Sequence, residues 1–330
     1  MLAPSSGEAS PEVSQDGLRV VRLPGGRGGR RSATVARLRG MSSAVARARR
    51  EGQPPDVIHA HVFSAGFLAV LLGRRWRLPV VVSEHHSDLI EDRLSAWDAR
   101  IARFTYRQAD LVCPVSPLLE RSITRLEPRA RCEVVPNVVD IDAFAAPTRS
   151  PSATPRRRLI AVGLARQKGV PHLFEALRLL VRERPDVTLE IVGDGHERVS
   201  LETQAEGLPV TFVGVLPRAD LAARMRSADV LAMPSVVESF GIVAVEALAA
   251  GLPVVTTSAC GAADVVVAHG GLVVPPADPP ALSDALAVLL DSREGVPAAT
   301  IDELRRGYGP KMIAERWDAI YRSVVRTGHV

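Results

Sequence analysis

The sequence predicts an α/β protein made of two doubly wound parallel sheets. Short apolar runs alternate with longer segments of helical composition along most of the 330 residues, which is the pattern of parallel strands connected by helices. The alternation is interrupted at the Pro-, Ser- and Thr-rich stretch Pro147–Pro155, whose composition is typical of a linker between domains. A chain of this length can also bury two hydrophobic cores.

We therefore place a first domain at residues 1–147, a linker at 148–155, a second domain at 156–308 and a terminal segment at 309–330. The strands expected in the first domain are apolar runs, and several end at Pro or at polar residues. They are Leu18–Leu23, Asp56–His61, Pro79–Ser83, Asp110–Pro114 and Cys132–Pro136. The helices expected between them are Ser32–Arg50, Ala65–Arg75, Leu94–Arg107 and Ser116–Arg125, the last with Ser116 as its N-cap.

A second series of the same kind begins after the linker. Its expected strands are Leu159–Val162, Val187–Val192, Val210–Val213, Val230–Met233, Val254–Thr257 and Gly271–Val274. Its expected helices are Val170–Glu183, His196–Glu206, Leu221–Arg226, Ile242–Ala250 and Pro279–Leu290, followed by a terminal helix at Lys311–Val325. In such an arrangement the helices begin at the carboxyl ends of the strands, where α/β proteins bind their ligands.

The composition is that of a globular protein, with 46 % apolar and 24 % charged residues. Cys113, Cys132 and Cys260 are odd in number and lack the spacing of metal ligands, so we expect reduced, buried thiols. The apolar helical run Val62–Leu72 is too short to cross a bilayer, and the start of the chain has no basic-then-apolar signal peptide. These features predict a cytoplasmic protein.

Arginine is concentrated near the start of the chain. The segment 19–50 contains no acidic residue and ten Arg, namely Arg19, Arg22, Arg27, Arg30, Arg31, Arg37, Arg39, Arg47, Arg49 and Arg50. Such a segment is attracted to an anionic membrane surface or to an anionic acceptor, and a solvated charged face explains it equally well. A peripheral contact with the inner face of the membrane therefore stays open. We expect no nucleic-acid partner, because no interleaved aromatic residues or known binding motif accompany the Arg residues.

The helix expected at Ile242–Ala250 carries an unusual charge. Its residues are apolar on every side except at Glu246, and a helix that is apolar all round is a buried helix. An ionised carboxylate in such a helix is costly unless it has a partner. Glu238 lies eight residues earlier, in the polar loop Ser235–Gly241 that precedes the helix. Eight residues of helix span about 12 Å and return to roughly the same side.

This loop and helix together form a candidate anion site. Free backbone amides point outward at the positive end of the helix dipole, and they belong to Ser239, Phe240, Gly241 and Ile242. Each acid alone also fits a plainer interpretation, with Glu238 as an exposed loop charge and Glu246 as a core acid satisfied inside the protein. The pair, with Ser235 leading into it, favours a ligand site.

The stretch Glu238-Ser-Phe-Gly-Ile-Val-Ala-Val-Glu246 closely resembles the two-glutamate signature of retaining, nucleotide-sugar-dependent glycosyltransferases of family 4. The resemblance extends over about residues 2–325 and is strongest after Leu159. It implies the GT-B fold, in which two Rossmann-like domains face each other across a cleft. In this family the terminal helix returns to the first domain, so we expect the helix Lys311–Val325 to pack there.

The resemblance assigns roles to residues at the expected cleft. Glu246 would bind the ribose hydroxyls of the donor, Glu238 would contact its sugar hydroxyls, and the amides of residues 239–242 would face the sugar and phosphates. Gly214, Val215 and Leu216 follow a strand. They match the family position that contacts the base of the nucleotide. Ser235 flanks the same pocket.

A second glycine loop, Gly163-Leu-Ala-Arg-Gln-Lys-Gly169, follows the first strand of the second domain. Its cations suit a diphosphate, with Lys168 as a point charge and Arg166 as a planar fork, although a surface Lys is the plainer alternative. The loop is similar to the Gly-Arg…Lys-Gly loop of the family, but it is one residue shorter and Leu164 stands at the usual Arg position. By this resemblance Lys168 would stabilise the leaving diphosphate, with Arg166 as a candidate substitute for the missing Arg.

His85, at the end of a first-domain strand, matches a family His whose imidazole touches the donor sugar near the reacting centre. A polar loop His without such a role is the alternative, and His86 should point away. With Glu238 and Lys168, His85 completes the predicted catalytic residues. His59 and His61 share one strand face but have no third ligand nearby in the sequence, so we predict no metal site.

The beginning of the chain departs from the family pattern. Residues 3–6 look like the end of the family's second strand and residues 16–24 like its third. The first strand, the glycine loop after it and the first long helix have no counterpart. That strand is central in a doubly wound sheet, so its loss would leave backbone groups unpaired. We therefore expect either a true start further upstream or a truncated product.

The predicted function is the transfer of a hexose-type sugar from a UDP- or GDP-sugar to an acceptor hydroxyl with retention of configuration. The resemblance implies no cofactor, and an acceptor that is a glycan, a lipid or a small alcohol in glycan, glycolipid or cell-envelope polysaccharide synthesis. Two alternatives stay open. Another GT-B-like enzyme, such as a nucleotide-sugar epimerase, would isomerise the sugar without an acceptor, whereas a non-catalytic nucleotide-sugar-binding protein would bind the donor without turnover.

Overall fold

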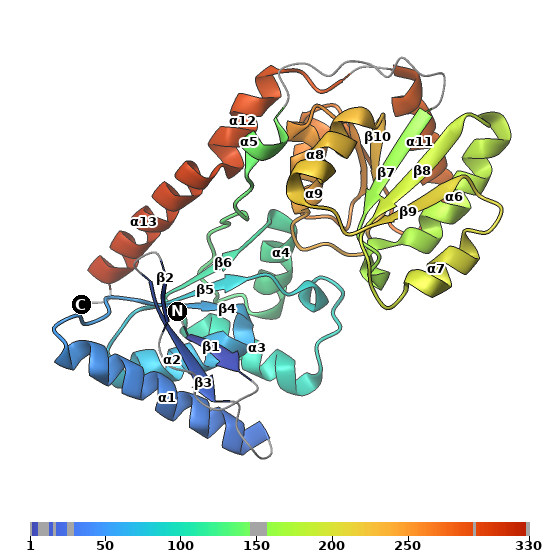
Figure 1. Cartoon of the computed structure of the whole chain (residues 1–330). Coiled ribbons are helices and arrows are strands. Elements are labelled where there is room, and N and C mark those ends of the chain that lie inside the picture. Colours follow the sequence, from blue (N-terminus) through green and yellow to red (C-terminus); the bar gives the residue numbers. More distant parts are fainter. Residues whose placement is uncertain are drawn as a thin grey trace.

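The computed structural model of the chain describes residues 2–5, 13–15, 18–24, 30–145, 157–292 and 295–327. Its helices and strands form two α/β units, and helix α13 (Pro310–Thr327) runs from the second unit back to the first (Figure 1). The predicted linker 148–155 lies outside the described residues.

The second unit is built on a six-stranded parallel sheet. Its strands are β7 (Arg157–Val162), β8 (Val187–Val192), β9 (Val210–Gly214), β10 (Val230–Met233), β11 (Val254–Thr257) and β12 (Leu272–Val274). They lie in the order β12-β11-β10-β7-β8-β9. The order reverses between β7 and β10, which is the switch point at which open α/β sheets bind ligands. All the strands predicted for this half of the chain are confirmed.

Helices cover both faces of this sheet. Alternate residues of β7 accordingly pack in two separate cores, with Leu159 and Ala161 in one and Ile160 in the other. The helical segments are η2 (Arg166–Lys168), α6 (Val170–Glu183), α7 (Arg198–Gln204), α8 (Arg218–Ser227), α9 (Ile242–Ala249), α10 (Ala263–Ala268), α11 (Pro279–Ser292) and α12 (Ala299–Tyr308). The sequence analysis did not predict α10 or α12. The α10 segment is rich in Val, which has a low helix propensity, and burial of Val266 stabilises it through tertiary packing.

The first unit contains a three-stranded parallel sheet in the order β4-β5-β6. Its elements are β4 (Ile58–His61), α2 (Val62–Trp76), β5 (Val80–Glu84), η1 (Ser87–Leu89), α3 (Ala96–Gln108), β6 (Leu111–Pro114) and α4 (Pro117–Leu126). The short helix α5 (Ile141–Phe144) follows in the chain and packs on α8, α9 and α12 of the second unit (Figure 1). The predicted N-cap is confirmed, since the Ser116 hydroxyl accepts a hydrogen bond from the Leu119 amide at 3.2 Å.

The strand predicted at Cys132–Pro136 is wrong. Cys132 forms an isolated bridge with Val112, and the Val135 amide donates to the Pro114 carbonyl at 2.9 Å. The segment therefore runs beside β6 without becoming a regular strand. Pro136 has no amide hydrogen with which to continue the pairing.

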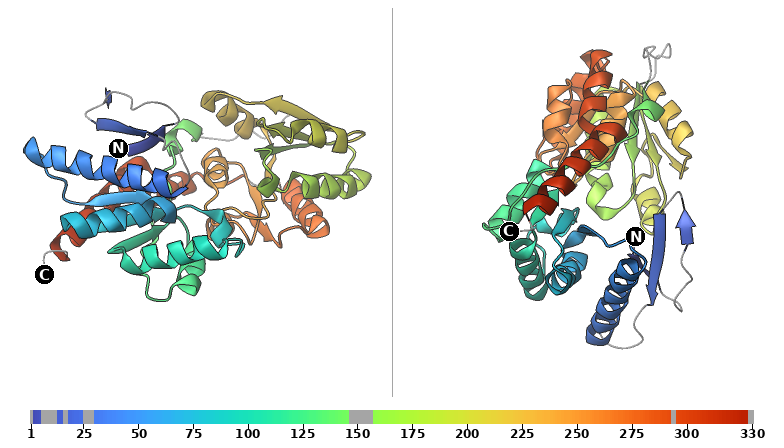
Figure 2. Two further views of the ribbon diagram at one scale, coloured as in Figure 1. Left: turned by 90° about the horizontal axis from the view of Figure 1, so that it is seen from below. Right: turned by 90° about the vertical axis from the view of Figure 1, so that its left-hand side faces the viewer.

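The first described residues form a sheet of their own in the order β1-β3-β2, from β1 (Leu2–Ser5), β2 (Val13–Gln15) and β3 (Leu18–Pro24). Helix α1 (Arg30–Arg50) follows and packs beside α2, as the blue ribbons of Figure 2 show. The Trp76 indole donates a hydrogen bond to the Ser42 hydroxyl between these two helices at 3.2 Å. The strand and the helix predicted near the Arg-rich segment are both present.

Helix α13 packs on one face of the β4-β5-β6 sheet. Its Ile320 and Val324 form a core with Val81 and Cys113 of that sheet, whereas Val80 and Val82 point to the opposite face and the core beneath α2. Strand β5 is thus buried on both sides. Among the described residues, no helix combines the length and apolar character that a bilayer crossing requires.

We predict that Ile320→Ala lowers the free energy of unfolding by about 2–5 kcal/mol, because it leaves a cavity under α13. Urea unfolding followed by circular dichroism measures the change. The matched control is Met312→Ala on the same helix, where the side chain is 39 % exposed and the expected change is within about 0.5 kcal/mol. Equal effects of the two substitutions would show that α13 is not docked through this core.

Candidate functional site

The candidate site lies at the carboxyl ends of the second unit's strands. Three loops meet there: residues 163–169 after β7, residues 215–217 after β9 and residues 234–241 after β10. Because all strands of this sheet are parallel, their carboxyl ends share one edge. The loops therefore bring together residues that are far apart in the sequence.

Lys168 and Glu238 form an ion pair across two of these loops. The Lys168 ammonium Nζ lies 2.5 Å from Glu238 Oε2, and the two side chains are 23 % and 18 % exposed. The Val236 amide also donates to the Gln167 carbonyl at 2.9 Å, which ties the loops together. Two predicted catalytic residues are thus neighbours, and both remain accessible to a ligand.

Glycine permits this close approach. Gly169 has φ +67°, and a Cβ there would lie 2.1 Å from the Pro234 carbonyl oxygen. Gly163 has φ +96°, and a Cβ there would lie 3.3 Å from the Lys168 side chain, whose methylene carbons pass over it. Both glycines of the loop are therefore needed to place Lys168 opposite Glu238.

The structure shows where the two unusual residues of the loop 163–169, Leu164 and Arg166, lie. Leu164, at the usual Arg position, is buried in the core of the second unit. Arg166 lies on the exposed face of η2, so the structure does not place its guanidinium in the Lys168–Glu238 pair.

The β10–α9 loop ends in a helix start with unused donors. Gly241 has φ +102° and is the N-cap of α9, and a Cβ there would lie 2.8 Å from Cys260 Sγ. In the described part of the chain, the backbone amides of residues 239–242 have no protein acceptor, as expected at a helix N-terminus. Phe240 is buried against Tyr308, with ring centroids 5.8 Å apart, and Ile242 is 37 % exposed.

The remaining predicted donor residues differ in exposure. Gly214, with φ +82°, ends β9, and its carbonyl accepts from the Gly193 amide at 2.8 Å. Val215 is 75 % exposed and Leu216 is partly buried. Ser235 is fully buried, and its hydroxyl has no hydrogen-bond partner within the described residues.

Glu246 is buried in α9 at 6 % exposure, as predicted, but it has a partner that the sequence analysis missed. Its Oε1 accepts a hydrogen bond from Arg218 at 3.3 Å. Burial raises the pKa of the Glu246 carboxyl, the Arg218 hydrogen bond and charge lower it, and Asp140 raises it. One signal in the sequence could have found Arg218, because a cation in the first turn of a helix opposes the dipole and needs a specific partner.

The first unit touches the β10–α9 loop directly. The Ser116 hydroxyl, at the start of α4, donates to the Ser239 carbonyl at 2.6 Å. Gly261 fills the same contact, since a Cβ there would lie 2.3 Å from the Ser239 oxygen and 2.7 Å from Ser116 Cβ. The candidate anion site therefore lies next to the junction of the two units.

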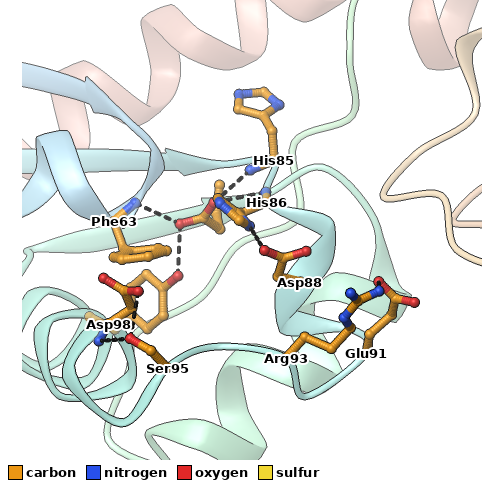
Figure 3. A network of polar contacts seen from close by, with 10 residues as sticks. Phe63, His85, His86, Asp88, Glu91, Arg93, Ser95 and Asp98 are labelled. Atoms are coloured by element: carbon orange, nitrogen blue, oxygen red, sulfur yellow. Dashed lines mark hydrogen bonds and ion pairs between the residues drawn. The ribbon is translucent and has the colours of Figure 1, made fainter. Parts of the chain in front are cut away.

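His85 follows β5 at the carboxyl edge of the first unit's sheet, and Glu84 holds its backbone. Glu84 is fully buried and accepts hydrogen bonds from the amides of Phe63 at 2.8 Å and of His85 and His86 at 2.9 Å, and from the Tyr106 hydroxyl at 2.7 Å. Figure 3 shows this network and the rings of His85 and His86 pointing in different directions, as predicted. Burial raises the pKa of Glu84, and these four hydrogen bonds oppose the rise.

His85 also joins a row of stacked histidines. His61 Nδ1 lies 3.3 Å from His85 Nε2, and the His59 and His61 ring centroids are 4.8 Å apart. His59 in turn bonds the Tyr321 hydroxyl of α13 at 2.7 Å. Burial first, then the neighbouring His61, lowers the pKa of His85, which favours its neutral form. Among the described residues, no group of His, Cys, Asp or Glu is arranged to hold a metal.

Comparisons with known proteins identify the family to which this chain belongs. The chain matches the model of the Glycosyl transferase 4-like domain over residues 1–138 and that of Glycosyl transferases group 1 over residues 147–305. A phosphatidyl-myo-inositol mannosyltransferase of Mycobacterium leprae (strain TN) is 33 % identical over 345 residues, covering 99 % of this chain and 88 % of that protein. The chain therefore belongs to the group 1 glycosyltransferases of the family 4 type.

Further relatives extend this result. A glycogen synthase of Mycobacterium tuberculosis (strain CDC 1551 / Oshkosh) is 32 % identical over 250 residues, covering 72 % of this chain, and the match spans 60 % of that relative's length. The sucrose-phosphate synthase structure from Thermosynechococcus elongatus has a TM-score of 0.81 at 21 % identity, covering 99 % of this chain and 89 % of that chain. Anabaena Alr3699/HepE in complex with UDP and glucose has a TM-score of 0.75 at 22 % identity, covering 93 % and 87 %. These similarities confirm the predicted GT-B fold.

We predict that His59 makes the protein less stable in acid. Burial, with His61 and His85 nearby, lowers the pKa of His59 from 6.5 to about 4. Between these values the unfolded chain binds a proton that the folded protein does not, so the free energy of unfolding falls as the pH drops. Urea unfolding between pH 7 and 4 should show a shallower acid limb for His59→Gln than for wild type. The control is His196→Gln, whose side chain is 89 % exposed, and an unchanged limb in His59→Gln would contradict the prediction.

Proposed function

We propose that this glycosyltransferase moves a hexose-type sugar from a nucleoside diphosphate sugar to an acceptor hydroxyl with retention of configuration. The observation that carries the proposal is the accessible Lys168–Glu238 pair beside the unused amides of residues 239–242. A diphosphate needs cationic and amide donors, and a sugar needs a carboxylate acceptor. The presence of UDP and glucose in the Anabaena structure supports the same class of donor.

Donor binding exchanges the ion pair for contacts to the ligand. Lys168 and Glu238 neutralise each other in the structure, with Nζ and Oε2 2.5 Å apart. A diphosphate attracts the Lys168 ammonium and the amides of residues 239–242, which frees the Glu238 carboxylate for sugar hydroxyls. Glu246 then faces the ribose and the segment 214–216 the base. We expect no cofactor besides the donor, either a UDP- or a GDP-sugar.

The proposed transfer breaks the bond between the anomeric carbon and the phosphate oxygen and forms a bond to the acceptor oxygen on the same face. The acceptor proton passes to an oxygen of the leaving phosphate. Negative charge grows on the diphosphate as this happens, and Lys168 with the fixed amides stabilises it. His85, with its lowered pKa, acts as a neutral hydrogen-bonding group toward the donor sugar from the first unit.

The proposed location is the cytoplasm, with contact to the inner face of the membrane through the ends of α1 and α2. Arg50, Arg75 and Arg77 are exposed there, and α1 contains no acidic residue. Two guanidinium groups contact the Trp76 ring, with Arg49 at 4.9 Å and Arg75 at 5.7 Å from its centroid. Clustered Arg attracts anionic lipid headgroups.

We predict that Lys168→Ala lowers kcat by about 10²- to 10³-fold, a larger loss than in donor affinity, because its charge matters most while the phosphate leaves. A panel of UDP- and GDP-sugars with candidate acceptors, followed by release of the nucleoside diphosphate, measures kcat. Calorimetry measures donor affinity, and NMR of the product reports the anomeric configuration.

The control for this experiment is Lys311→Ala, whose side chain is 87 % exposed and whose turnover should equal that of wild type. Unchanged turnover in Lys168→Ala would contradict the assigned role. An inverted product would refute retention, and turnover that needs no acceptor would indicate the epimerase alternative.

We predict that the triple variant Arg50→Gln/Arg75→Gln/Arg77→Gln loses binding to vesicles of phosphatidylcholine with phosphatidylglycerol, since each basic residue near an anionic surface contributes about 1 kcal/mol. Co-sedimentation at two salt concentrations measures this binding. The control Arg182→Gln/Arg322→Gln/Arg326→Gln removes the same charge from exposed positions on α6 and α13. An equal loss of vesicle binding in both triple variants would show that binding depends on net charge alone and not on this Arg cluster.

A further inference from the structure

We propose that Arg218 is the positioning residue for Glu246, holding its carboxylate so that one oxygen faces the ribose of the bound donor. The inference rests on the proposed function, because it explains how the ribose contact of that site is built.

The two oxygens of Glu246 have different surroundings. Oε1 accepts the hydrogen bond from Arg218 at 3.3 Å. Within the described residues Oε2 receives no hydrogen bond. It is not one of the fully buried polar atoms without a partner, so it is not completely shielded from solvent. Glu246 therefore keeps one acceptor with some access from outside, although its side chain is only 8 % exposed. A ribose hydroxyl is a donor that fits this free acceptor.

Arg218 is itself held from several sides. Its second terminal nitrogen, NH1, lies 3.4 Å from Asp140 Oδ2, and its guanidinium lies 5.5 Å from the centroid of the Phe144 ring. Asp140 is the N-cap of α5, whose first-turn amide of Ala143 donates to Oδ1 at 3.3 Å. A planar guanidinium fixed at two edges and one face has little freedom to rotate, so Glu246 is held in turn.

The position of Arg218 also indicates a site rather than core packing. Its side chain is 52 % exposed, so the hydrophobic core does not require it. It begins α8 directly after the loop 215–217, which is the proposed wall for the base. A cation in the first helical turn opposes the helix dipole, and two carboxylates offset this cost.

The charges around Glu246 show why Arg218 matters. Burial raises the pKa of Glu246, and Arg218 is the cation that lowers it, against a further rise from Asp140. The other charged residues of the helices packed on α9 do not pair with Glu246. Asp142 pairs with Arg305, Arg305 also pairs with Asp302, and Arg224 pairs with Glu190. Glu303 lies 3.8 Å from His269, burial and then Asp264 raise the pKa of Tyr308, Asp220 and Arg306 are exposed, and Arg226 is half-buried. Without Arg218, Glu246 would ionise only at a higher pH.

The test compares UDP with 2′-deoxy-UDP, or GDP with 2′-deoxy-GDP if the protein prefers guanine, by calorimetry at pH 7.0 and 8.5. The ratio of the two dissociation constants reports the ribose hydroxyl contact independently of overall affinity. We expect wild type to bind the ribonucleotide about tenfold or more tightly, as a hydrogen bond to a charged group requires. Glu246→Gln should bring the ratio toward one at both pH values.

Arg218→Met should bring the ratio toward one, because the Glu246 carboxylate loses the hydrogen bond that orients it. Any part of the ratio that returns should return at the higher pH, because burial raises the pKa of the Glu246 carboxyl and Arg218 no longer opposes that rise. Arg218→Lys, which keeps the charge but not the planar fork, should lie between Met and wild type. The matched control is Arg224→Met on the same helix, whose guanidinium pairs with Glu190 at 2.9 Å and is 43 % exposed. Its ratio should equal that of wild type, and thermal melts confirm that each variant is folded.

The outcomes separate this inference from the proposed function. A wild-type ratio in Arg218→Met, together with a lost ratio in Glu246→Gln, would overturn the positioning role and leave the donor site intact. A wild-type ratio in Glu246→Gln would remove the ribose contact and the inference with it. If wild type bound neither UDP nor GDP, the proposed function itself would fail.

Discussion

A carboxylate taken out of water must receive hydrogen bonds or a cation, and this constraint shapes both units where they face each other. In the first unit Glu84 is fully buried and is satisfied by three backbone amides and the Tyr106 hydroxyl. These bonds join the end of β5 to the start of α2 and to α3, so the backbone that presents His85 is held at several points. In the second unit Glu246 is nearly as buried, but Arg218 satisfies only one of its oxygens. The completely satisfied acid supports the structure, and the incompletely satisfied acid leaves an acceptor for a ligand.

The Lys168–Glu238 pair differs from the two buried acids in its exposure to solvent. Both side chains are partly exposed, so the pair costs less desolvation than a buried one and contributes little to stability. Its two members are held by loops in which Gly163 and Gly169 allow the backbones to approach closely. A ligand with a diphosphate and a sugar can therefore replace each partner of the pair without leaving a buried charge unpaired. This is a preorganised arrangement, in which the positive charge already lies where the leaving group is proposed to depart.

Residues outside the proposed ligand contacts also link the site to its surroundings. Ser116 at the start of α4, in the first unit, donates to Ser239. Asp140, in the segment that leads from the first unit to α5 on the second, bonds Arg218. One contact reaches the loop proposed for the phosphates and the other the side chain proposed to position the ribose carboxylate. The Ser116–Ser239 hydrogen bond therefore joins the proposed donor site to the first unit, from which His85 comes.

Local sequence predicted much of the fold. The periodic segments Val170–Glu183 and Val187–Val192 have the predicted bounds, because their hydrophobic patterns match their secondary structure over enough residues. The errors fall where local pattern and packing disagree. The apolar run Cys132–Pro136 lacks a full ladder, and the Val-rich α10 is helical because its neighbours bury Val266.

By itself the sequence determined the parallel α/β alternation, the loops at the carboxyl ends of the strands, and the need of a charged Glu246 in an apolar helix for a partner. It also placed Lys168 and Glu238 in two such loops, but these loops are neighbours only because β7 lies next to β10 in the sheet. Only the tertiary structure decided which groups serve as partners, as Arg218 for Glu246 across 28 residues and Ser116 for Ser239 across 123 residues show. Local pattern records that a buried charge or a helix end needs a partner, but the choice of partner depends on how distant elements pack in three dimensions.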